Sequence, residues 1–267
     1  MKTVAIINMK GGCGKTTTAV NMAHILGKDY GMRVLLVDND KQGNASKAYA
    51  VHSYELPSVA DILTGETDIT EVIRKTDYEF IDVIPGNMHL LNANLEIIMD
   101  QEIEQQTIFR NQFDQIGTLY DYCIIDCPPD INVSVINALA AADEVIIPIK
   151  IDGYSLDGME ELERQIENVK ELNPKVRFRG CLVTMFYRTQ WKDEEGKYQQ
   201  GVNEQGEEWL RMQKYPVFHT HIRRTPKKVD ENTFTDIPLV EYRQGCGASK
   251  DYRQFVNEYL SDRFGHK

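Results

Sequence analysis

A glycine-rich segment at residues 10–17 (Lys-Gly-Gly-Cys-Gly-Lys-Thr-Thr) limits the possible folds of this chain more than any other stretch. Residues 4–7 before it are apolar and predict a buried β-strand, and residues 18–26 after it repeat apolar side chains at helical spacing. A strand, a glycine-rich turn and a helix in this order direct several backbone N–H groups and the positive end of the helix dipole at one anion. The segment therefore predicts a phosphate-binding loop. The alternative is a glycine-rich surface turn without a ligand.

Two side chains of this loop have the chemistry that a nucleotide phosphate requires. The ammonium of Lys15 is expected to reach the β- and γ-phosphates, and the hydroxyl of Thr16 is expected to bind Mg²⁺. Lys10 is a second lysine, directly before the first glycine, and Met9 stands where the ordinary phosphate-binding pattern has a glycine. The loop therefore departs from the ordinary pattern at two positions.

Two later apolar runs end in carboxylates. Residues 34–37 lead into Asp38 and Asp40, and residues 122–125 lead into Asp126, which two prolines follow closely. Ligands of open parallel sheets bind beyond the carboxyl ends of the strands, so all three carboxylates are expected to face the phosphates. The second run has the form of a Walker B strand, in which Asp126 would hold a water ligand of the metal. The alternatives are loop aspartates that cap the next helix and, for Asp126, an ordinary strand-end residue.

Strands and helices alternate from residue 4 to residue 185, which is typical of a parallel sheet covered on both faces. The predicted fold class is α/β: a single-domain, doubly wound, mainly parallel sheet over residues 1–267. Residues 189–209 are polar and predict an extended loop or hairpin with a helix from near Glu204. The apolar residues between 90 and 99 are expected to pack into the core.

Composition narrows the possible functions. The chain has 30 basic and 41 acidic residues and a formal net charge of −11, so any DNA binding requires a local basic patch. Its five cysteines are scattered without a Cys-x-x-Cys pair, which argues against zinc, disulfide and iron–sulfur frameworks. No signal peptide is recognisable and no apolar run approaches the ~20 residues of a membrane span, so a cytoplasmic location is expected.

The loop with its second lysine resembles the deviant Walker A box of the ParA/MinD ATPases, a class of P-loop NTPases. The run from Asp38 to Asn44 is similar to the Asp-x-Asp-Pro-Gln-Gly-Asn box of the same family, with Lys41 in place of the proline. The resemblance covers nearly the whole chain. Because the family usually has a shorter connection at residues 189–209, the resemblance implies an insertion there. Because the phosphate-binding strand begins at residue 3, without a preceding helix-turn-helix, the expected type is the short, Soj-like ParA.

The resemblance implies an ATPase that uses ATP and Mg²⁺ and forms an ATP-dependent homodimer, with two nucleotides between the subunits. Lys10 would reach the phosphates of the partner subunit, Asp40 would position the attacking water, and Asp38 would support the metal. The catalytic candidates are therefore Lys10, Lys15 and Asp40, and the metal-binding candidates are Thr16, Asp38 and Asp126. The ATP-binding candidates are Lys10, Gly11, Gly12, Cys13, Gly14, Lys15, Thr16 and Thr17.

Residues 211–228 contain six lysines and arginines and two histidines but no Asp or Glu. Cations grouped in this way can replace the counterions of a phosphate backbone without reading its bases. The alternative is a solvated surface. By the resemblance, Arg188 and Arg224 occupy positions of non-specific DNA binding in ParA-like proteins, and Arg223 replaces a common proline. The DNA-binding candidates are Arg188, Arg223, Arg224, Lys227 and Lys228.

The resemblance also implies partners: non-specific double-stranded DNA, and a ParB-type centromere-binding protein that stimulates hydrolysis and thereby releases the DNA. The expected function is DNA partition at the nucleoid. The alternative is a MinD-like positioning ATPase that binds a membrane through an amphipathic helix at residues 252–264. Because Glu258 and Asp262 share the polar face of that helix with two arginines, we expect a core-packing helix and no stable membrane association. A third possibility, a ligase or reductase on the same fold, needs a substrate pocket or cluster cysteines.

Overall fold

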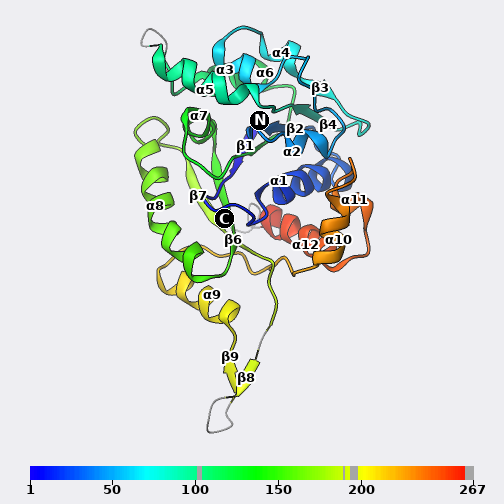
Figure 1. The fold of residues 1–267 in the computed structure, drawn as a ribbon, viewed down its shortest axis with the longest axis vertical. Helices are drawn as coiled ribbons and strands as arrows, with labels where there is room; N and C mark the ends of the chain where they lie inside the picture. The colour runs from blue at the N-terminus through cyan, green and yellow to red at the C-terminus, as the bar shows by residue number, and fades with distance from the viewer. Residues whose placement is uncertain (101–103, 189, 193–197, 262–267) are drawn as a thin grey trace.

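The computed structural model describes residues 1–100, 104–188, 190–192 and 198–261 (Figure 1). Its centre is a seven-stranded sheet in the order β3-β4-β2-β5-β1-β6-β7. Neighbouring strands run parallel except for β3, which pairs antiparallel with β4 at one edge. The strands are β1 (Lys2–Ile6), β2 (Val34–Asp38), β3 (Arg74–Lys75), β4 (Ile81–Ile84), β5 (Tyr122–Asp126), β6 (Glu144–Lys150) and β7 (Arg177–Thr184). The predicted α/β class with a mainly parallel sheet is confirmed.

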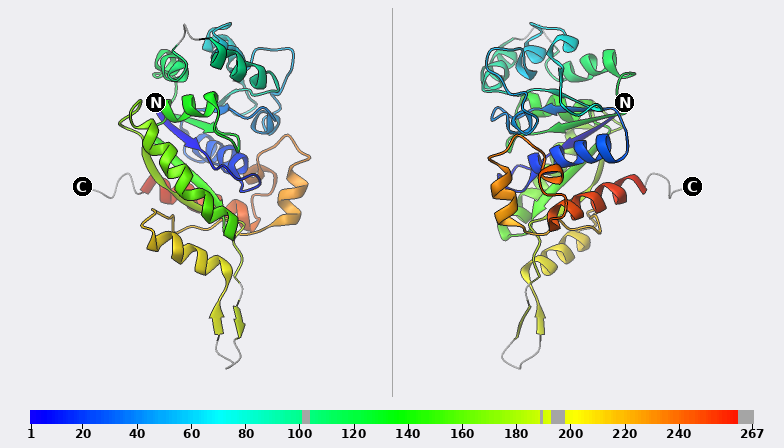
Figure 2. Two further views of the ribbon diagram at one scale, coloured as in Figure 1. Left: turned by 60° about the vertical axis from the view of Figure 1, so that its left-hand side comes forward. Right: turned by 90° about the vertical axis from the view of Figure 1, so that its right-hand side faces the viewer.

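Helices cover both faces of this sheet (Figures 1 and 2), because successive strand residues point to opposite sides. Val4 and Leu36 pack in one core cluster with α1, α11 and α12, whereas Ala5 and Leu35 pack in another with α3, α5, α6, α7 and α8. The helices are α1 (Lys15–His24) with its π-helical continuation η1 (Ile25–Asp29), α2 (Asn44–Lys47), α3 (Val59–Thr64), α4 (Ile69–Val72), α5 (His89–Met99), α6 (Ile108–Ile116), α7 (Val133–Ala141), α8 (Gly153–Val169), α9 (Val202–Met212), α10 (Pro226–Asn232), α11 (Leu239–Tyr242) and α12 (Gly247–Ser261).

The carboxyl ends of β1, β2 and β5 meet at one edge of the sheet. β5 lies between β1 and β2, and its last residue, Asp126, is in register with both Ile6 and Asp38. Beyond β1 the chain continues into the glycine-rich loop, and α1 begins at Lys15. Three segments that are distant in the sequence therefore converge on one place, as the parallel-sheet prediction requires.

The last helix, α12, packs into the core. Tyr252, Phe255, Val256 and Tyr259 are all buried, and the Phe255 ring meets the Phe218 ring edge-on with 4.9 Å between centroids. The prediction of a core-packing helix is confirmed over the described part, which ends at residue 261; the rest of the 252–264 stretch lies outside the described residues. Within the described ranges, the chain has no helix with the length and apolar character of a membrane span.

The predicted hairpin is also present. β8 (Gln190–Lys192) and β9 (Tyr198–Gln200) pair antiparallel and project away from the body of the molecule (Figure 2). The helix that follows, α9, begins at Val202, two residues before the predicted start at Glu204. Residues 189 and 193–197 of the expected insertion lie outside the described residues.

The prediction that the apolar residues between 90 and 99 pack into the core is only partly right. Leu90 is buried, but Leu91, Leu95, Ile98 and Met99 are exposed. The reason is that α5 packs through one side only, mainly against α3 and α7. Its opposite side is left apolar and open to solvent.

Candidate functional site

The loop at residues 10–17 depends on two glycines for its shape. Gly12 and Gly14 have φ values of 70° and 88°, in the left-handed region that favours glycine. A Cβ at Gly14 would make only ordinary contact with Thr184, 3.7 Å away, so backbone conformation rather than space requires glycine there. Thr18 donates the first helical hydrogen bond to the Gly14 carbonyl, at 2.9 Å. The first N–H groups of α1 therefore lack helical acceptors and are available to an anion.

Lys15 is held by the backbone of its own loop. Its side chain is buried, and its Nζ donates to the Lys10 carbonyl at 2.9 Å. The Cys13 thiol donates to the same carbonyl at 3.3 Å, and burial raises the pKa of this thiol, so it stays protonated at neutral pH. The Thr184 hydroxyl, at the end of β7, donates to the Cys13 carbonyl at 2.7 Å. The Lys15 ammonium is therefore held against the backbone of the glycine-rich loop, and Cys13 and Thr184 brace that loop.

Lys10 extends in a different direction from Lys15. Its Nζ forms an ion pair with Asp152, directly before α8, and Lys150 lies 3.8 Å from the same carboxylate. The side chains of Lys10 and Asp152 are each 31% exposed. Lys15 therefore contacts the backbone of its own loop, whereas Lys10 extends to a partly exposed carboxylate at the edge of the site. Sequence reasoning did not identify Asp152, because it lies 142 residues from Lys10 and no local pattern marks it.

Asp38 organises the loop after β2. Its carboxylate is fully buried and accepts hydrogen bonds from the N and Oγ of Ser46, at 2.7 and 2.6 Å. Burial raises the pKa of the Asp38 carboxyl to about 6, although the Ser46 bonds act in the opposite direction. The Asp40 carboxylate accepts from the N of Gln42 at 2.9 Å and is partly exposed. Asp38 therefore supports this loop, and Asp40 remains accessible to solvent.

Asp126 is the carboxylate of the site that lacks partners. Both of its oxygens are buried and have no hydrogen-bond partner among the described residues. Burial, with the nearby charge of Asp38, raises the pKa of Asp126 well above its usual value, although the nearby Thr16 hydroxyl acts in the opposite direction. Such a group is costly unless a cation or water completes it, so Asp126, with Thr16 at the start of α1, fits a Mg²⁺ ion and its water ligands.

The three aspartates do not form a metal cage by themselves. In the part of the chain that the structure describes, no group of three or more His, Cys, Asp or Glu side chains could hold a metal ion. Mg²⁺ at this place would take further ligands from a nucleotide and from water, as is usual for this ion.

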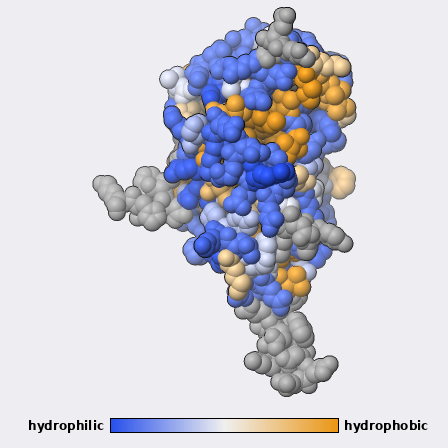
Figure 3. Space-filling model, turned by 90° about the vertical axis from the view of Figure 1, so that its left-hand side faces the viewer, coloured by the Kyte–Doolittle hydropathy of each residue, from blue (hydrophilic) through white to orange (hydrophobic). Residues whose placement is uncertain are grey.

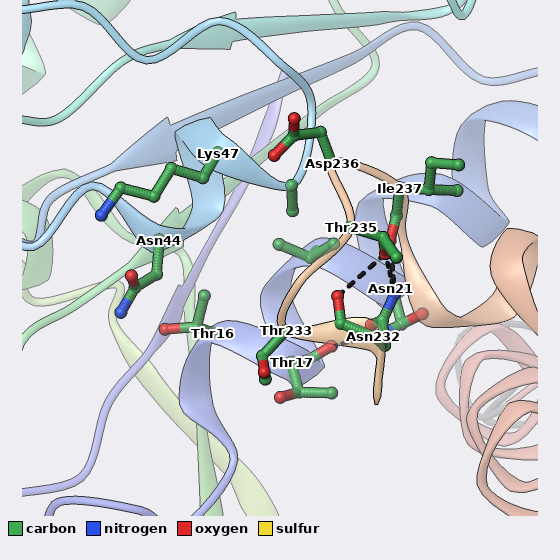
Figure 4. A pocket seen from close by; sticks show the side chains of 12 residues that line it. Thr16, Thr17, Asn21, Asn44, Lys47, Asn232, Thr233, Thr235, Asp236 and Ile237 are labelled. Carbon is green, nitrogen blue, oxygen red and sulfur yellow. Dashed lines mark hydrogen bonds between the residues drawn. The ribbon is translucent and has the colours of Figure 1, made fainter. Parts of the chain in front are cut away.

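A cavity of about 340 Å³ opens beside the first turn of α1 (Figure 4). Thr16 and Thr17 line it from α1, and Asn44 and Lys47 line it from α2. The loop at residues 232–237 closes the side away from α2 (Figure 4). The cavity therefore connects the predicted metal ligand Thr16 with the segment that follows Asp38 and Asp40.

A second cavity, of about 270 Å³, opens beside Gly14 and Thr17. Met185, Ile222 and Pro226 give it apolar walls. The Met185 backbone has a φ of 52°, which is uncommon for a residue other than glycine. An apolar cavity next to a phosphate-binding loop has the properties that a nucleoside base requires.

The structure brings Arg188 and Arg224 onto neighbouring segments. The N of Phe186 donates to the Ile222 carbonyl and the N of Arg224 donates to the Phe186 carbonyl, each at 2.9 Å. The Arg224 guanidinium lies over the Tyr187 ring, 5.9 Å from its centroid. Both arginines are exposed, so two candidates that are 36 positions apart in the sequence share one surface.

The other DNA-binding candidates differ in their surroundings. Arg223 is bound to Asp251 of α12 through its backbone N at 2.9 Å and its Nε at 2.7 Å. Lys228 forms an ion pair with Glu231 at 3.0 Å, and Lys227 is exposed. The charge of Arg223 is thus already balanced, and this residue connects the wall of the second cavity with the last helix. No local pattern indicates this pairing, because its partners are 28 residues apart.

Comparison with known proteins defines the family. A sequence family described as an AAA domain (AAA_31) matches residues 1–178. The sporulation initiation inhibitor protein Soj of Bacillus subtilis is 39% identical over 186 residues, which are 69% of this chain and 72% of that protein. The chromosome partitioning protein ParA of Caulobacter vibrioides is 31% identical over 265 residues, which are 98% of this chain and 94% of that protein. The chain belongs to the ParA/Soj family of P-loop ATPases.

A solved structure supports the nucleotide site of this ParA/Soj-like ATPase. The cobyrinic acid a,c-diamide synthase of Mycobacterium smegmatis, with a bound ATP analog and magnesium, matches with a TM-score of 0.81 and 25% identity, covering 100% of this chain and 97% of that one. The fold is thus shared with a metabolic enzyme and does not by itself distinguish such an enzyme from a partition ATPase. The similarity to the ParA and Soj sequences makes that distinction. ATP and Mg²⁺ are the nucleotide and metal of this ParA/Soj-like site, as predicted.

Proposed function

We propose that this ATPase acts in DNA partition as an ATP-dependent dimer, with two nucleotides enclosed between subunits that meet face to face. The observation that carries the proposal is the different orientation of the two loop lysines. Lys15 contacts its own loop, whereas Lys10 reaches the partly exposed Asp152 and can exchange this contact for the phosphates of a second subunit. Relatives named as chromosome partitioning proteins support a role in partition.

The proposed hydrolytic step uses groups of the loops described above. Asp40, which the turn at Gln42 holds in place, positions the attacking water. Lys15 stabilises the charge of the transferred phosphoryl group. Thr16 and Asp126 would hold Mg²⁺, which when bound would supply positive charge against the phosphate oxygens. Closure of the dimer adds Lys10 of the second subunit, so hydrolysis depends on both copies.

In this proposal the dimer binds DNA without sequence preference through Arg188 and Arg224, with Lys227 beside them. Two subunits double the number of cations that face one duplex, and each phosphate contact releases counterions, so the affinity rises steeply on dimerisation. Arg223 contributes less, because Asp251 already balances its charge. Hydrolysis, stimulated by a ParB-type partner, reopens the dimer and releases the DNA at the nucleoid.

The test is binding to random-sequence duplex DNA with ATP–Mg²⁺, with ADP–Mg²⁺ and without nucleotide, each at two salt concentrations. Binding is expected only with ATP, and it should weaken with salt and fall about tenfold in Arg224→Ala, which removes one phosphate contact from each subunit. Lys175→Ala is the matched control, since it removes an exposed cation before the opposite end of β7. Equal binding in all nucleotide states, or binding that Arg224→Ala leaves unchanged, contradicts the proposal.

A further inference from the structure

The loop after β2, which carries Asp40, makes a tight turn at Gly43. Gly43 has a φ of 65°, in the left-handed region that favours glycine, and its N donates to the Asp40 carbonyl at 2.9 Å. The Asp40 carboxylate accepts from the N of Gln42, also at 2.9 Å. The direction of the Asp40 carboxylate therefore depends on where the backbone of residues 42 and 43 lies.

Two neighbours leave no free space beside this turn. A Cβ on Gly43 would lie 2.4 Å from Cδ2 and 2.8 Å from Nε2 of His52, and 2.6 Å from the Gly86 carbonyl oxygen. A Cβ on Gly86 would lie 2.8 Å from the Asp40 carbonyl oxygen. The turn is thus enclosed between the backbone of Gly86 and the edge of the His52 ring. Because a closely packed interior transmits displacements, a shift of the ring also shifts the turn.

The backbone on both sides of His52 is anchored. The N of Val51 donates to the Ser46 carbonyl at 3.0 Å. The Ser53 carbonyl accepts from Nδ2 of Asn87 at 2.8 Å. The His52 ring therefore projects at the turn from a fixed segment, and its contact with Gly43 does not depend on a loose loop.

The His52 ring is the inner member of a short row of aromatic rings. It meets the Tyr54 ring edge-on, with 4.9 Å between centroids, and Tyr54 lies 6.4 Å from the ring of His89, the first residue of α5. The row ends at α5, whose exposed apolar side chains gather on the upper part of the face in Figure 3. His52 is half-buried, whereas Tyr54 and His89 are exposed. The row therefore offers a matched comparison, because His52 and not His89 supplies the atoms nearest to Gly43.

The surroundings of His52 favour a neutral ring. Its Nε2 is buried and has no hydrogen-bond partner among the described residues. A neutral ring can carry its proton on Nδ1, but a protonated ring has an N–H at both nitrogens, so that Nε2–H would be buried without an acceptor. Burial, with the positive charge of Lys47, lowers the pKa of His52. The charged and titratable side chains on the segments around the ring are Asp40, Lys41, Lys47, Tyr54, Glu55 and His89.

We propose that His52 is a positioning residue for ATP hydrolysis, whose neutral ring holds the Gly43 turn and thereby orients the Asp40 carboxylate. The inference rests on the proposed function, in which Asp40 positions the attacking water. Without the ring, the turn has space to move, so the water is held in the reactive geometry for a smaller fraction of the time. Protonation of the ring has the same effect, because the buried Nε2–H then drives the ring away from the turn.

The first test compares the kinetics of three variants of the full chain. His52→Ala should lower kcat by about tenfold or more while the KM for ATP changes by less than about twofold, because the ring orients a reacting group and does not bind the nucleotide. His52→Gln places an amide near the position of Nε2 and should restore most of the lost kcat. His89→Ala is the matched control, since it removes the outer histidine of the same row, and it should keep the kcat of the unmodified chain.

Amide hydrogen exchange measures the hold on the turn without reference to activity. The N–H groups of Gln42 and Gly43, both bonded to Asp40, should exchange faster in His52→Ala than in the unmodified chain. His89→Ala should leave their exchange unchanged. Unchanged exchange in His52→Ala would overturn the inference, and so would faster exchange together with an unchanged kcat.

The pH dependence of kcat tests the requirement for a neutral ring. Turnover of the unmodified chain should fall as the pH drops below the usual histidine pKa of about 6.5 toward the lowered pKa of His52, since the protonated fraction rises. The Asp38 carboxyl, with a pKa of about 6, titrates in the same range in every variant. The decisive quantity is therefore the difference from His52→Gln, which has no ring to protonate and should lose less kcat at acid pH. Identical profiles would overturn the inference, because the neutral ring is part of it.

Two further measurements separate the inference from the proposed function. Turnover is measured without DNA, so a failure of ATP-dependent DNA binding would reject the partition function and leave the result for His52 intact. A normal kcat of Asp40→Asn would reject the hydrolytic role of Asp40 and, with it, the action of His52 through that residue. If Asp40→Asn is inactive while His52→Ala turns over normally, the inference alone is wrong.

Discussion

At the scale of single residues, the site contains three aspartates in three different environments. Ser46 satisfies the buried carboxylate of Asp38, a local turn holds Asp40, and Asp126 is buried without any partner among the described residues. A group like Asp126 lowers the stability of the nucleotide-free protein. Under the proposed function, a bound Mg²⁺ ion and its water ligands would offset this cost.

Asp126→Asn is expected to stabilise the nucleotide-free protein by on the order of 1–2 kcal/mol near neutral pH, while it prevents ATP hydrolysis. Folding raises the pKa of Asp126. The resulting loss of folding free energy is therefore absent well below the usual pKa of about 4, and it grows as the pH rises toward the pKa of Asp126 in the folded protein. Urea denaturation should therefore show a difference from the unmodified protein near neutral pH that nearly disappears below a pH of about 3.

The control for this prediction is Asp114→Asn, which changes an exposed carboxylate on α6. Its stability relative to the unmodified protein should not depend on pH. If Asp126→Asn is less stable than the unmodified protein near neutral pH, then the buried carboxylate has a partner that its surroundings do not show.

At the scale of elements, the sequence is sufficient to predict segments that are contiguous. It does not predict contacts between residues that lie far apart in the sequence. The phosphate-binding loop and its flanking strand and helix are contiguous, so the spacing of the glycines and apolar residues is sufficient to predict them. The partners Asp152 and Asp251 come from other elements, and only the tertiary structure shows them. The exposure of one side of α5 was not predicted for a different reason. Its apolar residues lie all around the helix, so no periodicity tells which side packs.

Phe255→Ala tests whether α12 belongs to the core. The substitution removes a fully buried ring that packs edge-on against Phe218, so we expect a loss of about 3–5 kcal/mol in the free energy of unfolding. Gln254→Ala, at the next and exposed position, should change it by less than about 0.5 kcal/mol. Chemical denaturation measures both. A small effect of Phe255→Ala together with lost binding to anionic vesicles would instead favour a membrane-binding helix.

At the scale of the whole molecule, charge is distributed unevenly. The chain has a net charge of −11, yet Arg188 and Arg224 adjoin each other beyond the carboxyl end of β7. Under the proposed function, DNA repels a single subunit over most of its surface and attracts it at the patch of Arg188 and Arg224. Under the same proposal, the cations of a second subunit are needed to overcome this repulsion. Because the dimer forms only with ATP, the net negative charge of the chain makes DNA binding depend on ATP.

Lys10→Ala should leave ATP binding nearly intact, because Lys15 and the loop backbone remain, but it should prevent ATP-dependent dimerisation and turnover. Light scattering after size exclusion measures the dimer, and a fluorescent ATP analogue measures binding. Lys150→Ala is the control, since it removes the other lysine beside Asp152 and should dimerise normally. If Lys10→Ala forms dimers and hydrolyses ATP at the unmodified level, the face-to-face arrangement is wrong.

The bonds between Arg223 and Asp251 couple α12 to the wall of the second cavity. Residues 222–226 line the cavity beside Met185, and α12 cannot separate from them without breaking these bonds. A base held in that cavity therefore makes local opening of α12 rarer, and the amide hydrogens of the helix exchange more slowly with solvent. If that cavity holds the base of the nucleotide, as the proposed function implies, amide exchange in α12 reports whether the site beside Gly14 is occupied.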